Sequence, residues 1–465
     1  MIKEFIKQVQ KGEINIVEKT KEVIEKIKSI NKDYNYFNTI SEELALQLAE
    51  ELAKAPGGKL AGLFITIKDC IVVKDVESRA GSAILNGYVP LFDATVVSRL
   101  KKHGAIILGK TAQDAFGFGS FSVNVGKGFK IPKNPFDRDR TTGGSSGGAA
   151  GITKKADFPH VAIAESTGGS IVCPASFCGV FGLCPTYGRV SRYGLMDYAN
   201  SLDKIGPIAK NIYDIALVME IISGHDPNES TTLKAQVPKY TDSVNKSVNG
   251  MKVAIIRDLL DKADPEVKQK TEEAIKKLER AGVSTEEANL PLTKDYAIAT
   301  YYLISTAEAS TNLAKYCGMR YGAHEKLEGN FNEYFTKVRS LYFNNEAKRR
   351  IILGTFARMA GYRDAYYLKA LKVRTKIIEE YKNVFKKYDA ILTPTMPMLP
   401  PKFDDIKKLT PLQNYLADVL TVGPNLAGMP HLNIPVGEHE GLPIGVLLTA
   451  DHLQEEKLIQ LGSLF

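Results

Sequence analysis

The sequence contains no tryptophan, few histidines and only five cysteines among its 465 residues. The cysteine number is odd and no pair has C-x-x-C spacing, which argues against both a disulfide framework and a zinc ribbon. We expect reduced thiols of the core and no metal site. The cysteines are Cys70, Cys173, Cys178, Cys184 and Cys317.

Long apolar runs and nucleotide-binding loops are also missing. The apolar segments are short and interrupted, and Met1–Glu4 does not begin a signal peptide, so we expect a cytoplasmic protein without a membrane segment. Neither of the two serine-bearing glycine clusters ends in the Gly-Lys-Ser/Thr of a P-loop or fits G-x-G-x-x-G. The chain offers no ATP motif of its own.

The composition is ordinary for a soluble enzyme with a substantial core, at 44% hydrophobic and 25% charged residues. The net charge of +8 is compatible with an acidic partner or a tRNA surface, and the abundance of lysine explains it equally well. No linker divides the chain. We expect one domain over 1–465, with a helical segment at 1–60, a core at 61–225 that carries the motifs, and a C-terminal half at 226–465.

Predicted helices and strands alternate along the chain, which favours an α/β fold with a mostly parallel or mixed sheet and helices on both faces. A polar segment, 228–247, is the best candidate for a surface crossover. The predicted elements are a helix capped by Asp93 that stops at Gly104, a strand at 105–109, a helix from Asn211 to near Gly224, a strand at 251–256, a helix from Asp264 to Gly282, a strand at 389–393 and a hairpin turn at Glu440–Gly441.

The two glycine clusters, Gly143–Gly148 and Thr167–Ser170, make serine the candidate nucleophile. Glycines surround a serine where the backbone must turn sharply and present N–H groups to a reacting atom, as an oxyanion hole requires. Flexible loops are the plain alternative. The second cluster follows the apolar run Val161–Ala164, which predicts a buried strand leading into a turn and favours Ser170.

A serine nucleophile needs a base, and no histidine has a telling position; His160 is nearest and is expected to be structural. A lysine kept neutral by burial is the alternative base. Lys68 fits because it closes the apolar segment Leu60–Ile67 and has no carboxylate partner within that segment. Most lysines are solvated surface charges, so position alone leaves that interpretation open.

These motifs together resemble the amidase signature family: the segment from Gly62 to Asp69, the GGSSGG cluster and the TGGSI-x-x-PASFCG run occur in the family's order. The resemblance implies one sheet of about eleven strands. It also implies a triad of Ser170 as nucleophile, Ser145 as a bridging serine in a cis peptide and Lys68 as base. The further residues it implies are Ser146 as a supporting hydrogen-bond partner and the backbone of Thr167, Gly168 and Gly169 in the oxyanion hole.

Segments across the whole chain, such as Pro185–Leu195 and Ala307–Ala314, are similar to the A subunits of glutamyl-tRNA(Gln) amidotransferases within that family. That likeness implies that Arg350 and Asp418 grip the amino-acid end of glutamine. A guanidinium can fork onto an α-carboxylate, and a carboxylate can accept from an α-ammonium. A surface charge is the alternative for Arg350, and Arg349 is the neighbour most easily mistaken for it.

The likeness further implies glutamine hydrolysis that supplies ammonia within a complex with the B and C subunits. In that complex the partner uses ATP and Mg²⁺ to convert Glu-tRNA(Gln), and Asp-tRNA(Asn) is a second candidate substrate. A stand-alone amidase for a small carboxamide and a scaffold without catalysis are the alternatives.

Three departures bear on this choice: Ser166, Val172 and Cys184 replace the family's usual Asp, Arg and Lys. Joint loss of a buried pair can be nearly neutral, so we expect a compensated site.

Overall fold

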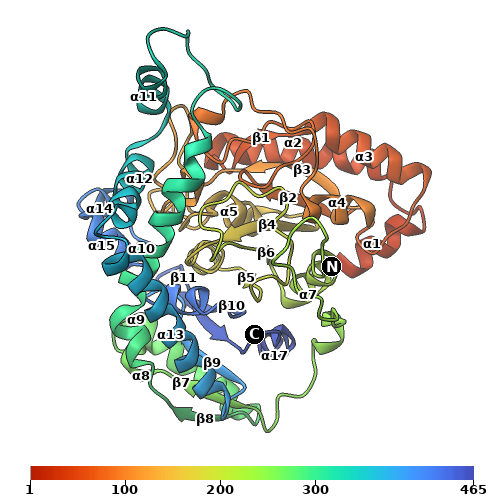
Figure 1. The fold of residues 1–465 in the computed structure, drawn as a ribbon. Coiled ribbons are helices and arrows are strands. Elements are labelled where there is room, and N and C mark those ends of the chain that lie inside the picture. The colour runs from red at the N-terminus through yellow and green to blue at the C-terminus, as the bar shows by residue number, and fades with distance from the viewer. Residues whose placement is uncertain (1) are drawn as a thin grey trace.

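The computed structural model describes residues 2–465, and its centre is one mixed sheet of eleven strands in the order β1-β3-β2-β4-β6-β5-β10-β11-β9-β7-β8. The predicted fold class is confirmed. Figure 1 shows the sheet running through the molecule. The strands are β1 Phe37–Ile40, β2 Phe64–Lys68, β3 Ile106–Thr111, β4 His160–Ser166, β5 Phe181–Cys184, β6 Lys204–Ala209, β7 Lys252–Ile255, β8 Ser284–Glu287, β9 Ala390–Pro394, β10 His431–His439 and β11 Leu442–Thr449.

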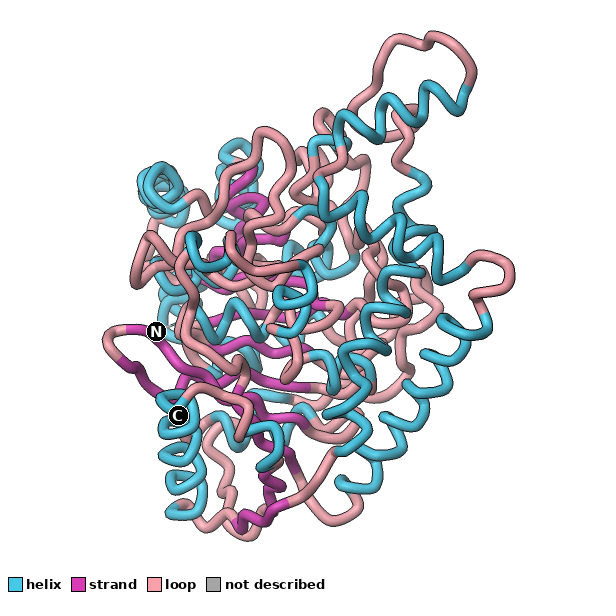
Figure 2. The backbone as a smooth tube through the Cα atoms, turned by 90° about the vertical axis from the view of Figure 1, so that its left-hand side faces the viewer, coloured by secondary structure: helices cyan, strands magenta, loops and turns pink. Residues whose placement is uncertain are grey.

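Helices lie on either side of the strands, as Figure 2 shows. Within the described residues 2–465, no helix is both long and apolar enough to cross a bilayer. The α-helices are α1 Ile2–Gln10, α2 Ile16–Tyr34, α3 Glu42–Lys54, α4 Thr95–Lys102, α5 Gly147–Lys155, α6 Val172–Phe177, α7 Ile212–Ile222, α8 Arg257–Leu260, α9 Pro265–Arg280, α10 Pro291–Asn312, α11 Phe331–Tyr342, α12 Asn345–Arg358, α13 Lys369–Phe385, α14 Phe403–Ile406, α15 Pro411–Leu416, α16 Val422–Leu426 and α17 Glu455–Gly462.

Strand β4 shows why both faces are covered. Its side chains alternate: Ala162 and Ala164 pack in one buried cluster with residues of α5 and α6, whereas Val161 and Ile163 belong to the larger core. All seven residues of β4 are buried. Strands β2, β3 and β4 run parallel to one another, so the carboxyl ends of β2 and β4 lie at the same edge of the sheet.

Most predicted elements are present, within a few residues of their expected ends. Asn211 caps α7 by accepting from the Asp214 N–H, and Glu440 and Gly441, both with positive φ, form the turn between β10 and β11. Residues 228–247 do cross from the β6 and α7 region to β7. They are not merely a surface segment, because Tyr240 is buried and accepts from Arg189 Nε at 2.8 Å.

Two predictions were wrong in detail. The segment 1–60 is not entirely helical, since β1 pairs antiparallel with β3. Asp93 does not cap α4, where Ala94 holds the cap position. The Asp93 carboxylate instead accepts from the Lys74 N–H and pairs with Lys101 at 2.9 Å, because a charged partner on α4 competes with the capping contact.

Candidate active site

Lys68 and Ser145 meet at the carboxyl end of β2. The Lys68 Nζ atom lies 2.8 Å from Ser145 Oγ, and both side chains are fully buried. The Gly144–Ser145 peptide is cis, as the family resemblance implied. Gly144 has no room for a side chain, because a Cβ there would overlap with the Asp114 carboxylate. The two residues therefore form a preassembled pair that excludes water.

Lys68 does have a carboxylate partner, contrary to the sequence prediction. Glu165 Oε2, from the end of β4, lies 2.9 Å from Lys68 Nζ, and the Glu165 carbonyl oxygen lies at the same distance. The partner was missed because it comes from a neighbouring strand 97 positions away. A signal existed: Glu165, like Lys68, is a charged residue closing an apolar strand. An adjacent carboxylate stabilises the ammonium form of a lysine.

Ser170 lies in the turn between β4 and α6, and it is 7% exposed, which leaves it accessible in an otherwise buried site. The backbone N–H groups of Gly168, Gly169 and Ser170 have no backbone acceptor within residues 2–465. A Cβ on Gly168 would lie 2.7 Å from the Tyr301 ring, and one on Gly169 would overlap with Thr421 Oγ1. Only glycine fits at these two positions, and free N–H groups beside a serine suit an oxyanion hole.

Ser146 supports the pair rather than capping α5. Its hydroxyl donates to the Glu165 carbonyl oxygen at 3.1 Å, the same oxygen that accepts from Lys68. Thr167 also contributes more than backbone, because its Oγ1 atom lies 2.9 Å from Glu165 Oε1 and 2.8 Å from Asp203 Oδ1. The side chains at the end of β4 thus hold Lys68 in place.

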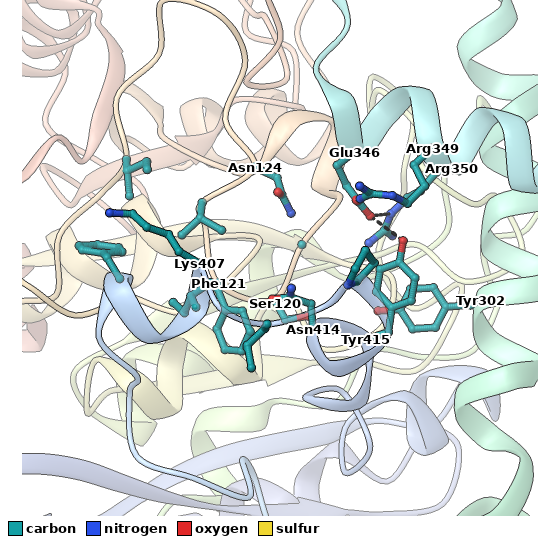
Figure 3. A pocket seen from close by; sticks show the side chains of 17 residues that line it. Ser120, Phe121, Asn124, Tyr302, Glu346, Arg349, Arg350, Lys407, Asn414 and Tyr415 are labelled. Atoms are coloured by element: carbon teal, nitrogen blue, oxygen red, sulfur yellow. Dashed lines mark hydrogen bonds and ion pairs between the residues drawn. The ribbon is translucent and has the colours of Figure 1, made fainter.

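A cavity of about 470 Å³ carries Arg350 in its wall (Figure 3). Arg350 Nε donates to Glu346 at 2.8 Å, its Nη1 donates to Tyr198, and its guanidinium lies 5.0–5.5 Å from four aromatic ring centres. Its side chain is 3% exposed, against 41% for Arg349, which also lines the cavity. The buried position fits Arg350 better for gripping a small ligand, and it is not a helix-surface charge.

Asp418 lies behind the same wall. Its two oxygens accept from Ser120 Oγ at 2.5 Å and Tyr302 Oη at 2.7 Å, and both of these residues line the cavity. Burial raises the pKa of the Asp418 carboxyl, while the hydrogen bonds from Ser120 and Tyr302 oppose that shift. The structure therefore brings Arg350 and Asp418 together, with Tyr302 between them. Ser120, Tyr198, Tyr302 and Glu346 were not predicted.

The cavity and the serine loop share their neighbours. The Ser120 carbonyl accepts from the Gly144 N–H at 2.8 Å, so the residue that holds Asp418 also flanks the cis peptide. On the other side, Tyr301 packs on Gly168, and Thr421, whose N–H donates to the Asp418 carbonyl at 3.0 Å, packs on Gly169. Arg350 and Asp418 thus belong to the surroundings of Lys68, Ser145 and Ser170.

The three departures from the family pattern pack as an uncharged group. Val172 and Cys184 are fully buried in one apolar cluster, and Ser166 accepts from Asn425 Nδ2 at 3.1 Å. The carboxylate of this segment comes instead from Glu165, which the strand's alternation points to the other face. One charge remains nearby: buried Lys204 donates to the Met429 carbonyl, and burial lowers the pKa of its amine.

His160 has the structural role expected of it. It is buried, its Nε2 atom lies 3.0 Å from Thr66 Oγ1, and burial lowers its pKa to about 3. The cysteines are free thiols; Cys317 is partly exposed and the other four are buried. Cys173 approaches the site, with its Sγ 3.3 Å from the Ser120 carbonyl.

The chain belongs to the amidase family, whose model matches residues 18–459. It is 42% identical to the A subunit of glutamyl-tRNA(Gln) amidotransferase from a Sulfurihydrogenibium species, over 100% of this chain and 96% of that protein. It is 46% identical to the protein of the same name from Koribacter versatilis, over 94% and 92%. The crystal structure of its namesake from Thermotoga maritima superposes with a TM-score of 0.80 at 36% identity, covering 98% of this chain and 93% of the other.

Proposed function

We propose that this chain is the glutamine-hydrolysing A subunit of a tRNA-dependent amidotransferase. The observation that carries the proposal is the buried Arg350 and Asp418 in the wall of one cavity, beside the serine loop. A guanidinium and a carboxylate on one wall match the α-carboxylate and α-ammonium of a free amino acid. A simple carboxamide needs neither group.

The reaction starts with Ser170. Neutral Lys68 takes a proton from Ser145, Ser145 takes one from Ser170, and the Ser170 oxygen attacks the side-chain amide carbon of glutamine. The backbone N–H groups of the 167–170 turn hold the oxyanion. Ammonia leaves with the proton returned along the same relay, and water then hydrolyses the γ-glutamyl ester to release glutamate.

Ammonia is useful only if a second site consumes it. We assign that site to a B-type partner, held in place together with a C-type partner. ATP and Mg²⁺ are assigned to the B-type partner, since this chain has no P-loop sequence. Glu-tRNA(Gln) is the proposed acceptor, with Asp-tRNA(Asn) as a second candidate, and the cytoplasm is the proposed location.

An exposed apolar surface supports a partner. It lies on and just after α12, the helix that carries Arg350, and we call it the α12 patch. Contiguous exposed apolar side chains usually mark an interaction site. Its members are Ile352, Leu353, Phe356, Met359, Tyr362 and Tyr366.

The test is to measure glutamine hydrolysis by the full chain alone and with its B and C subunits, with and without Glu-tRNA(Gln). The proposal predicts hydrolysis that rises when the partners and the tRNA are added. Full activity on simple amides with no response to partners would indicate a stand-alone amidase. No hydrolysis in any mixture would indicate a scaffold.

A further inference from the structure

The contact between Lys68 and Glu165 poses a chemical problem for the reaction. The Lys68 Nζ atom has three acceptors, Ser145 Oγ at 2.8 Å and two oxygens of Glu165 at 2.9 Å. An ammonium group carries three protons and no lone pair. With all three protons donated, Lys68 cannot accept a proton from Ser145, so it must first lose one.

Glu165 is the acceptor in place for that proton. The two side chains are 0% and 4% exposed, and no water-facing route for the proton is needed because their atoms are in contact. Away from water, an ion pair has a large desolvation penalty that a neutral pair does not have. Burial therefore reduces the difference in free energy between the charged and the neutral forms of the pair.

The other oxygen of Glu165 is held by a second carboxyl group. Thr167 Oγ1 lies within hydrogen-bonding distance of both Glu165 and Asp203, but a hydroxyl has only one proton to give. One of the two carboxyl groups must therefore supply a proton. Burial, and next the charge of Glu165, raise the pKa of Asp203 well above its usual range. Asp203 then donates to Thr167, and Thr167 donates to Glu165.

We propose that Glu165 is a positioning residue that receives the proton of Lys68 and so creates the amine that acts as base. The N–H bond of the Lys68 ammonium breaks and an O–H bond forms on Glu165 Oε2. The ion pair becomes a neutral amine and a neutral carboxylic acid, with no change in total charge. The amine lone pair then accepts the proton of Ser145. This inference rests on the proposed roles of Lys68, Ser145 and Ser170.

Few other ionisable groups act on the pair. The thiols of Cys70 and Cys184 have pKa values raised by burial and stay protonated. Asp114 has its pKa raised by burial to about 7, so it titrates in the range of an activity profile. It is present in every variant below, and its contribution cancels in a comparison. The remaining charges, Asp69, Lys110, Arg192 and Lys204, interact with these neighbours.

The experiment compares pH profiles of glutamine hydrolysis by the full chain with its partners, for the wild type, Glu165→Gln, Glu165→Asp and Glu455→Gln. Without the carboxylate, Lys68 must lose its proton to solvent. We expect Glu165→Gln to lower kcat at neutral pH by about 100-fold, the low end for a lost acid–base group, with little change in KM. Its acidic limb should move to higher pH, with partial recovery in alkali. Glu165→Asp should keep the wild-type limb at a lower kcat.

Glu455 is the matched control, because it is fully buried, accepts from the Thr186 N–H and lies on α17 outside the site. Glu455→Gln should leave the profile unchanged. A higher kcat in Glu165→Gln at neutral pH would overturn the proposal, because Glu165 would then only hold Lys68 in its charged form. A loss of equal size at every pH, with no shift of the limb, would also overturn it and would indicate a structural role.

A second substrate separates this inference from the proposed function. Acylation of Ser170 by a small activated ester needs the same proton relay but not the glutamine pocket. If glutamine is not hydrolysed while ester acylation shows the predicted shift in Glu165→Gln, the inference stands and the proposed substrate is wrong. If glutamine is hydrolysed and neither substrate shows the shift, the inference fails alone.

Discussion

Lys68 Nζ and Ser145 Oγ lie 2.8 Å apart although the residues are separated by 77 positions in the sequence. The contact joins the end of β2 to the start of α5, and both side chains are shielded from water. Every step proposed for the reaction passes a proton through this contact. Changes at Lys68 should therefore affect chemistry more than binding.

Replacing Lys68 by arginine tests the base directly. Arginine keeps a positive charge but does not give up its proton at working pH, so Lys68→Arg should lower kcat by about 100-fold or more. Activity of the wild type should fall as the pH is lowered, since protonation removes the base. The measurement is steady-state glutamine hydrolysis, with thermal unfolding to confirm that the variant is folded. Substantial activity in a folded Lys68→Arg protein would show that another group is the base.

Truncating the pocket should weaken glutamine binding. Arg350→Ala and Asp418→Ala should raise KM for glutamine strongly, because each leaves a charge of the ligand unpaired at a cost of about 2–5 kcal/mol. Hydrolysis of simple amides should change far less. The measurement is KM for both substrate types.

The matched control for the pocket is Arg349→Ala, one position away and much more exposed. If Arg349→Ala raises KM as much as Arg350→Ala does, the assignment of the α-carboxylate contact to Arg350 is wrong. A crystal with bound glutamine would then decide which guanidinium reaches the ligand.

His160 should make the fold sensitive to acid. Burial lowers its pKa from 6.5 to about 3, so below pH 6.5 the unfolded chain takes up a proton that the folded chain does not. This contribution is fully present above pH 6.5 and is lost as the pH falls toward 3. At about 1.4 kcal/mol per pH unit, it amounts to roughly 2 kcal/mol between about pH 7 and about pH 5. Denaturant unfolding should show that His160→Gln lacks this part of the decrease; an identical decrease in both proteins would contradict the account.

The α12 patch should matter for assembly and not for hydrolysis. Phe356→Asp places a charge within the patch, so it should weaken association with the partner subunits while leaving the buried site intact. We expect a lower sedimentation coefficient in mixtures with the partners, and unchanged glutamine hydrolysis by the isolated chain. Leu91, exposed on a different part of the chain, offers the control Leu91→Asp. Equal effects of the two changes would remove the case for this surface.

The sequence predicted the parts of the site that depend on local pattern. An apolar strand followed by a glycine turn located Ser170, and a charged residue closing an apolar run located Lys68. It did not reveal what depends on strand order. Glu165 reaches Lys68 because β4 lies beside β2, and the sequence spacing contains no trace of that pairing. Asp93 failed as a cap for a similar reason: propensity names a residue that can cap, but a nearby lysine decided where its carboxylate points.

The most direct test of the central claim is the formation of Gln-tRNA by the full chain with its B and C subunits, using glutamine or free ammonia as the nitrogen source. The wild type should use both. Ser170→Ala should form no γ-glutamyl ester and should lose glutamine-dependent amidation, while ammonia-dependent amidation survives because external ammonia bypasses only this chain. Glutamine-dependent amidation that persists undiminished in Ser170→Ala would contradict the account.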